Sequence, residues 1–143
     1  IREFLHESAV GVLATVRGAQ PFVNSNIFVY DEDRHAIYLH TARTGRTRDN
    51  VEASAKAAFT VYETGRLLPA DEALEFSIEY GGVVVFGAAT VVEDPEAVDH
   101  GQGPAGPGHH VVRLQIDLGN GAVKYKKLAP DTIAAYGGKY LAR

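Results

Sequence analysis

Residues 38–50 read YLHTARTGRTRDN, a short apolar strand end that runs through His40 into a basic turn. Arg43, Arg46 and Arg48 stand there among threonines and a glycine, directly before a segment with helical character. Exposed amides and the helix dipole favour anions at a helix start, and guanidinium groups offer paired donors for phosphate oxygens. The turn is therefore a candidate site for a terminal phosphate.

A second interpretation of the same turn is a solvated basic helix start, partly neutralised by Asp49 and Glu52. Composition alone slightly favours this second interpretation, because basic turns are common. His40 is ambiguous in the same way, since a single histidine at a strand end is more often structural than catalytic. Its position before a candidate phosphate turn is what makes it of interest.

Composition narrows the class of protein. The chain has 143 residues, of which 45% are hydrophobic and 22% charged, as expected for one globular domain spanning residues 1–143. A net charge of −4 argues against broad nucleic-acid binding. No apolar run approaches the ~20 residues of a membrane span, and no signal segment is recognised at the start. Cysteine is absent, so redox chemistry has to come from a bound cofactor, and we expect a cytoplasmic protein.

Apolar segments separated by turn signals predict a mainly β protein. Short turns and brief helices between them favour an antiparallel barrel. Gly87 inside the longest strand indicates a bulge or a close backbone approach. The predicted strands are residues 9–16, 21–31, 36–40, 57–63, 81–94 and a final strand at 110–118. The predicted helices are residues 1–8, 47–58 and 130–137, and the second of them begins near Thr47 or Asp49. Residues 64–80 are predicted to form a long loop that extends an edge strand.

Polar residues occupy both rows of the second strand at its centre, where Asn24, Ser25 and Asn26 follow one another. They either face a polar ligand or mark a kink or edge with hydrated side chains, and the pattern favours neither. His100, His109 and His110 lie in a Gly/Pro-rich stretch without a carboxylate at ligand spacing, so we predict no metal site. No nucleophile elbow, nucleotide-hydrolase phosphate loop or dinucleotide fingerprint is present, which argues against hydrolases and kinases.

Five segments carry a family resemblance: GVLATV (11–16), PFVNSNIFVYD (21–31), IYLHTARTGRTRDNV (37–51), AAFTVYE (57–63) and YGGVVVFGAATVVED (80–94). Their order and spacing resemble the flavin-binding split-barrel superfamily, which includes pyridoxamine-phosphate oxidase. The HTAxxGR turn is most similar to the nitroimidazole-resistance (nitroimidazole reductase-like) group. The resemblance covers residues 1–94 and implies a six-stranded antiparallel split barrel. It also implies a homodimer with two FMN sites at the subunit interface.

The resemblance also implies roles for residues at matching positions. The implied flavin-binding residues are Asn24, Ser25 and Asn26 at the ring, His40 and Thr41 at the ring and ribityl chain, and Arg46 and Arg48 at the phosphate. His40 is the implied catalytic residue. The expected activity is that of an FMN-dependent oxidoreductase, which passes electrons from a reduced nicotinamide to a small planar acceptor such as a nitroimidazole or another nitro-aromatic.

The chain departs from the family in two places. Gly82 stands where relatives often carry serine, and residues 95–143 are atypical, with a Gly/Pro/His-rich stretch followed by a segment that looks like part of a ferredoxin-like α+β domain. These departures leave substrate specificity open. The alternatives to the expected activity are a non-catalytic FMN-binding module and a split barrel that binds haem or a deazaflavin.

Overall fold

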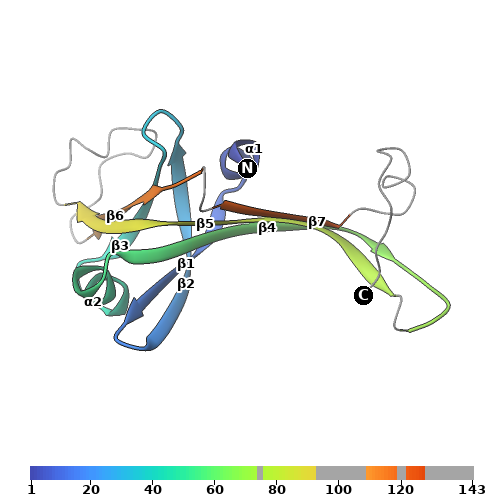
Figure 1. The fold of residues 1–143 in the computed structure, drawn as a ribbon, viewed down its shortest axis with the longest axis horizontal. Coiled ribbons are helices and arrows are strands. Elements are labelled where there is room, and N and C mark those ends of the chain that lie inside the picture. The colour runs from blue at the N-terminus through green and yellow to red at the C-terminus, as the bar shows by residue number, and fades with distance from the viewer. Residues whose placement is uncertain (74–75, 93–108, 119–121, 128–143) are drawn as a thin grey trace.

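The computed structural model describes residues 1–73, 76–92, 109–118 and 122–127, and all statements below concern these residues. Two short helices accompany a largely β structure (Figure 1). The elements are α1 (Arg2–Glu7), β1 (Val10–Arg17), β2 (Gln20–Asp31), β3 (Ala36–Ala42), α2 (Arg46–Ala53), β4 (Lys56–Leu68), β5 (Ser77–Val92), β6 (His109–Ile116) and β7 (Ala122–Lys127).

The strands form one antiparallel sheet in the order β4-β1-β2-β3-β6-β5-β7, and an additional β4–β5 pairing closes six of them into a ring. This arrangement confirms the predicted six-stranded antiparallel barrel. β5 makes the closure possible because it is 16 residues long. One of its edges pairs with β4, and the other pairs with β7 along Tyr80–Val85 and with β6 along Gly87–Val92. The strand predicted at 110–118 is therefore not the last one, because β7 follows it.

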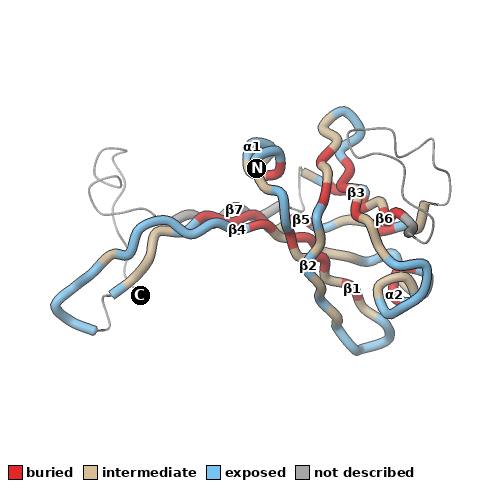
Figure 2. Tube along the Cα trace, turned by 180° about the vertical axis from the view of Figure 1, so that it is seen from behind, coloured by how far each residue is buried: buried red, intermediate tan, exposed pale blue. Residues whose placement is uncertain are grey.

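Buried residues gather along the strands of the ring (Figure 2), and their apolar side chains form the core of the barrel. In β1 the buried row alternates with an outward row, as a half-buried strand requires. Phe59 packs edge-on against Phe28 with ring centroids 4.8 Å apart, and Gly11 leaves room for the Phe59 ring. The predicted close approach at Gly87 is confirmed, because a Cβ atom there would collide with the carbonyl oxygen of Gln115.

The split of the barrel lies between β2 and β3. Their pairing runs from Asp31↔Ala36 to Phe28↔Leu39 and then stops. Before Phe28, β2 continues alongside β1, while His40–Ala42 of β3 continue alongside β6. The two strands therefore diverge, and the opening between them places the candidate site.

The long hairpin of β4 and β5 projects from the barrel as an arm, on the side away from α2 (Figure 1). Most of the segment predicted as a long loop is thus strand, with β4 reaching Leu68 and β5 beginning at Ser77. The carboxylate of Glu79 ties the two strands together. It accepts hydrogen bonds from the backbone amide, Nε and Nη2 of Arg66, at 3.1, 3.3 and 3.0 Å.

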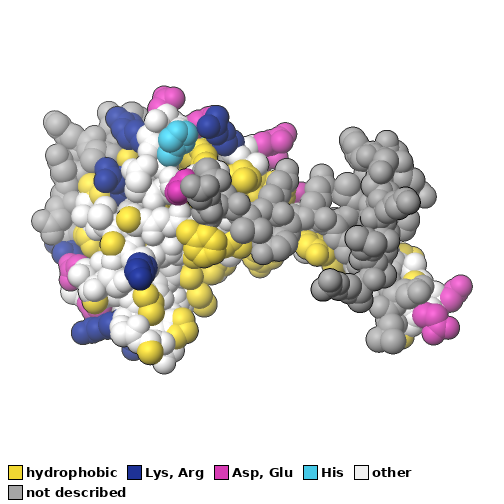
Figure 3. Space-filling view, viewed as in Figure 1, with side chains coloured by type: hydrophobic (Ala, Val, Ile, Leu, Met, Phe, Trp, Pro, Cys, Tyr) yellow, Lys and Arg dark blue, Asp and Glu magenta, His cyan; other side chains and the backbone are white. Residues whose placement is uncertain are grey.

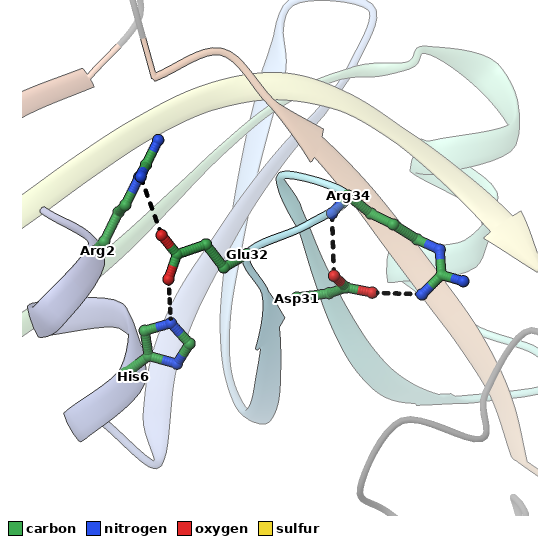
Figure 4. Close-up of polar contacts among 5 residues, drawn as sticks. All are labelled: Arg2, His6, Asp31, Glu32 and Arg34. Carbon is green, nitrogen blue, oxygen red and sulfur yellow. Dashed lines mark hydrogen bonds and ion pairs between the residues drawn. The ribbon is translucent and has the colours of Figure 1, made fainter.

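α1 is held against the β2–β3 turn by Glu32, which contacts two α1 side chains (Figure 4). Arg2 Nη1 and His6 Nε2 each lie 2.9 Å from one of its carboxylate oxygens. The hydrogen bond from His6 lowers the pKa of Glu32, and the charge of Arg2 adds to this effect. Asp31 binds Arg34 within the turn itself.

The helix predicted over residues 47–58 is shorter and begins earlier. α2 starts at Arg46 and ends at Ala53, and its N-cap is Gly45 rather than Thr47 or Asp49. Residues from Lys56 onward instead pair with β5 as part of β4, because the barrel needs a strand there to close. The helix predicted at 130–137 lies outside the described residues. No described helix has the length and apolar character needed to cross a membrane.

Candidate functional site

A cavity of about 550 Å³ occupies the opening between the diverging strands. β2 supplies one wall, the end of β3 supplies another, and the loop leading into α2 supplies the rim. The lining residues are Phe22, Asn24, Ser25, Asn26, Ile27, His40, Thr41, Ala42, Thr44, Gly45, Arg46 and Thr47.

Nearly all residues that the family resemblance singled out meet at this cavity. The residues among them that line it are Asn24, Ser25, Asn26, His40, Thr41 and Arg46. Arg48 does not line it. Its Nε atom forms an ion pair of 2.6 Å with Glu52 one helical turn away, and the side chain is 19% exposed. Of the two arginines that were expected to hold one phosphate, Arg46 lines the cavity and Arg48 does not.

The polar centre of β2 forms one wall because this part of the strand has lost its pairing with β3. Both side-chain rows border the opening there, which accounts for polar residues in both rows. Asn24 Oδ1 accepts a hydrogen bond of 3.3 Å from Thr47 Oγ1, and Asn26 Nδ2 donates one of 3.2 Å to the backbone oxygen of Asn24. These bonds orient both carboxamides and leave the Asn24 amide nitrogen available as a donor to a ligand.

The rim beside α2 carries the positive charge. Gly45 precedes the helix with φ of 130°, a conformation that favours glycine. The next residue, Arg46, is exposed and makes no ion pair with any described residue. Its guanidinium carbon lies 5.9 Å from the centroid of the Phe22 ring, within the range of a cation–π contact. The rim therefore combines helix amides with a guanidinium that a ligand anion can reach.

α2 is fixed to the barrel by a buried polar contact beneath it. Asn50 is fully buried, and its Nδ2 atom donates a hydrogen bond of 3.0 Å to Thr15 Oγ1 on β1. Val51 packs beside it in the core. Sequence patterns did not identify Asn50, Thr15 or the lining residue Phe22. A buried asparagine has no signal in hydrophobic periodicity, and Phe22 looked like an ordinary strand residue.

His40 stands where the β2–β3 pairing has just ended. It is half-buried, it lines the cavity, and its register partner on β6 is Val111. Ile27 lies on the opposite wall at the same end, so the cavity runs from His40 and Ile27 to Arg46 and Phe22 at the helix. The described residues contain no group of three or more metal-ligand side chains, and His100 lies outside them.

The sequence profile of the family Pyridoxamine 5'-phosphate oxidase matches residues 1–115. The chain belongs to this family, which confirms the resemblance to the flavin-binding split-barrel proteins. No curated protein matches the chain.

Solved structures share the fold at low sequence identity. The FAD and haem binding protein from Mycobacterium smegmatis has a TM-score of 0.72 and 18% identity, and the match covers 95% of this chain and 76% of that one. The flavocytochrome Anf3 from Azotobacter vinelandii has a TM-score of 0.71 and 19% identity, over 90% of this chain and 66% of the longer flavocytochrome. A proposed 5-nitroimidazole antibiotic resistance protein from Bacteroides thetaiotaomicron has a TM-score of 0.64 and 14% identity, over 82% and 78%.

Proposed function

We propose that this protein is a flavin-dependent oxidoreductase whose cavity binds the FMN moiety of the cofactor. The observation that carries the proposal is the placement of Arg46, which lines the cavity beside the start of α2 without an ion pair to any described residue. Arg46 would hold the phosphate at this end, and His40 and Ile27 would border the flavin ring. Family membership and the FAD-binding neighbours support a flavin as the ligand.

The polar lining also supports a flavin over a haem. Hydroxyl and amide side chains make up half of the cavity lining, and they match the hydrogen-bonding edges and hydroxylated chain of a flavin. The lining residues with such groups are Asn24, Ser25, Asn26, Thr41, Thr44 and Thr47. A haem macrocycle makes few hydrogen bonds with its surroundings, so these groups would contribute less to its binding than to that of a flavin.

A bound flavin supplies the capacity to accept hydride from a reduced nicotinamide and to pass electrons to an acceptor. The protein's own contribution is to hold the phosphate at Arg46 and to position the ring. We assign to His40 a contact with a small planar acceptor, such as a nitroimidazole or another nitro-aromatic, at the ring end. A reduced nicotinamide donor fits a cytoplasmic location.

A homodimer is part of the proposal, because exposed apolar side chains lie on a face that borders the cavity. Hydrophobic side chains gather where β1 and β2 cross β4 and β5 (Figure 3). Ile27 is 63% exposed on the outward row of β2, opposite Val10 of β1, and also lines the cavity, so a second copy seated on this outward face would border the ligand. The other large exposed hydrophobic residues on the outward face are Val10, Val23, Tyr62, Tyr80 and Phe86. Sedimentation at micromolar concentration should show a dimer, and a monomer with fully bound flavin would contradict it.

The first experiment is an absorption spectrum of the purified protein after addition of FMN and removal of the excess. We expect a retained two-band flavin spectrum that bleaches on addition of a reduced nicotinamide. If the retained flavin is not bleached by a reduced nicotinamide, the protein would be a flavin-binding module rather than an oxidoreductase. A protein that retains no flavin would contradict the proposal altogether.

A further inference from the structure

The helix that carries Arg46 does not fix its own orientation. α2 has eight residues, too few for a helix that is stable by itself in water. Its N-cap is Gly45, which has no side chain to cap the helix and leaves the backbone free to turn. The direction in which Arg46 points therefore depends on how α2 is attached to the barrel.

Two hydrogen bonds from one face of α2 reach neighbouring strands of the barrel. Thr47 donates one of 3.3 Å to Asn24 on β2. Asn50 donates one of 3.0 Å to Thr15 on β1. Positions three and four residues apart lie on the same face of a helix, so Asn50 shares its face with Thr47 and Arg46. Because the two bonds go to different strands, together they resist rotation of the helix about its axis.

Stability alone does not account for the buried pair of Asn50 and Thr15. Asn50 is fully buried, Thr15 is 4% exposed, and Asn50 Oδ1 has no hydrogen-bond partner within the described part of the chain. A buried amide oxygen without a partner is unfavourable, and two apolar side chains of similar shape would avoid that cost. What the polar pair adds is direction, because a hydrogen bond requires a defined distance and angle.

Three further contacts of α2 are less suited to setting its rotation. Val51 packs in the core, and apolar packing is not directional. Arg17 and Asp49 lie 3.8 Å apart with side chains 60% and 50% exposed, and such exposed ion pairs contribute little. The Thr47 hydroxyl lines the cavity together with its partner on β2, so a ligand competes for that bond. The bond between Asn50 and Thr15 is protected from such competition.

We infer that Asn50 and Thr15 are positioning residues for the phosphate end of the cavity. By holding α2 in one rotation, they keep the Arg46 guanidinium and the first helix amides directed at the phosphate of the flavin. Neither residue lines the cavity, so both act through the helix rather than by touching the ligand. This inference rests on the proposed function, because it concerns the same phosphate.

The test compares the dissociation constants of FMN and riboflavin, which differ only in the phosphate. Both are measured by quenching of flavin fluorescence on the full chain, and their ratio reports recognition of the phosphate. One variant is Thr15→Val, and a second combines it with Asn50→Leu, so that an apolar pair of similar shape replaces the polar one. Thr15→Ser is the matched control, because it keeps the hydroxyl. Val83→Ala is a control for lost stability, because it removes buried side-chain atoms on β5 and leaves the Asn50 bond in place.

We expect the unmodified protein, Thr15→Ser and Val83→Ala to bind FMN at least about tenfold more tightly than riboflavin, the effect of a hydrogen bond to a charged group. In Thr15→Val and in the double variant this ratio should fall by at least about threefold, while the affinity for riboflavin changes by less than about twofold. Urea unfolding would show that each variant is folded. The double variant should be closer in stability to the unmodified protein than Thr15→Val is, because it leaves no polar partner unpaired.

An unchanged ratio in folded Thr15→Val would overturn this inference and leave the proposed function standing. An equal fall of the ratio in Val83→Ala would also overturn it, because loss of stability would then be a sufficient cause. Equal binding of FMN and riboflavin by the unmodified protein would remove the phosphate contact on which the inference depends. Failure of the unmodified protein to bind either flavin would overturn both proposals.

Discussion

Thr47 at the start of α2 donates a hydrogen bond of 3.3 Å to the side-chain oxygen of Asn24 on β2. This bond joins the helix to the strand across the opening of the barrel, where β2 has no pairing with β3. It also fixes which end of the Asn24 carboxamide can serve a ligand. Because the oxygen accepts from Thr47, the amide nitrogen is the atom left to donate.

Replacing Thr47 with valine should weaken flavin binding by about two- to tenfold, the range of one net hydrogen bond. Valine keeps the shape of the side chain but frees the Asn24 carboxamide to rotate. Thr47→Ser should restore most of the affinity because it restores the hydroxyl. Titration with FMN would measure both effects, and equal affinities for the valine and serine variants would contradict the positioning role.

The two arginines around Thr47 provide a matched comparison. Arg46→Ala should weaken flavin binding by at least about tenfold, because a hydrogen bond to a charged group contributes about 1.5–3 kcal/mol. Arg48→Ala should change it by less than about threefold, since the Arg48 side chain pairs with Glu52 and does not line the cavity. FMN dissociation constants at fixed ionic strength would decide. Equal losses in the two variants would mean that Arg48 also reaches the phosphate.

The site was partly predictable because its residues lie in one strand and one turn. The alternation of β2, broken by Asn24, Ser25 and Asn26, was compatible with a polar ligand or a hydrated edge, and the turn after His40 with an anion site or a solvated basic helix start; the family resemblance favoured the ligand in both cases. The structure brings these segments to one cavity because β2 and β3 separate after the Phe28↔Leu39 pair. That separation is a property of the closed barrel, so no local pattern reveals it.

Other features depended on contacts between distant segments. Arg46 and Arg48 are two residues apart in the sequence, yet one faces the cavity and the other reaches Glu52 along the helix. Their surroundings differ because side chains two residues apart on a helix do not face the same way, and the helix starts at Arg46, one residue earlier than its predicted start at Thr47. The sequence likewise predicts a loop where the structure has the arm, because the strands of the arm are stabilised by pairing with each other and lack a row of buried apolar side chains.

His40 should affect turnover more than flavin binding. We expect His40→Ala to retain bound FMN and to lose at least about tenfold in the rate of nitro-aromatic reduction, because the acceptor loses a contact that positions it at the ring. His6→Ala is the control, because His6 contacts Glu32 and does not line the cavity. Stopped-flow measurement of the oxidation of the reduced flavoprotein by a nitro-aromatic would give this rate. Unchanged turnover in His40→Ala would remove its catalytic assignment.

The buried contact beneath α2 should contribute to stability. Thr15→Val preserves side-chain shape but removes the acceptor of the Asn50 amide, so we expect the free energy of unfolding to fall by about 1–3 kcal/mol. Thr60→Val on the outward row of neighbouring β4 should change it by less than about 0.5 kcal/mol. Urea unfolding would measure both. Equal changes in the free energy of unfolding of the two variants would show that the hydrogen bond between Asn50 and Thr15 does not contribute to stability.

Glu32 should make the docking of α1 sensitive to acid. Its pKa is lowered in the folded protein, chiefly by the hydrogen bond from His6 and further by Arg2, so its ionised form is favoured by folding. Its contribution to stability is complete above the ordinary glutamate pKa of about 4.3 and is lost as the pH falls through the lower folded-state pKa. We therefore expect Glu32→Gln to be less stable than the unmodified protein above about pH 5, with the difference shrinking toward pH 3. Urea unfolding at stepped pH would measure this difference. A gap that stays constant down to pH 3 would mean that the carboxylate charge does not hold α1 to the turn.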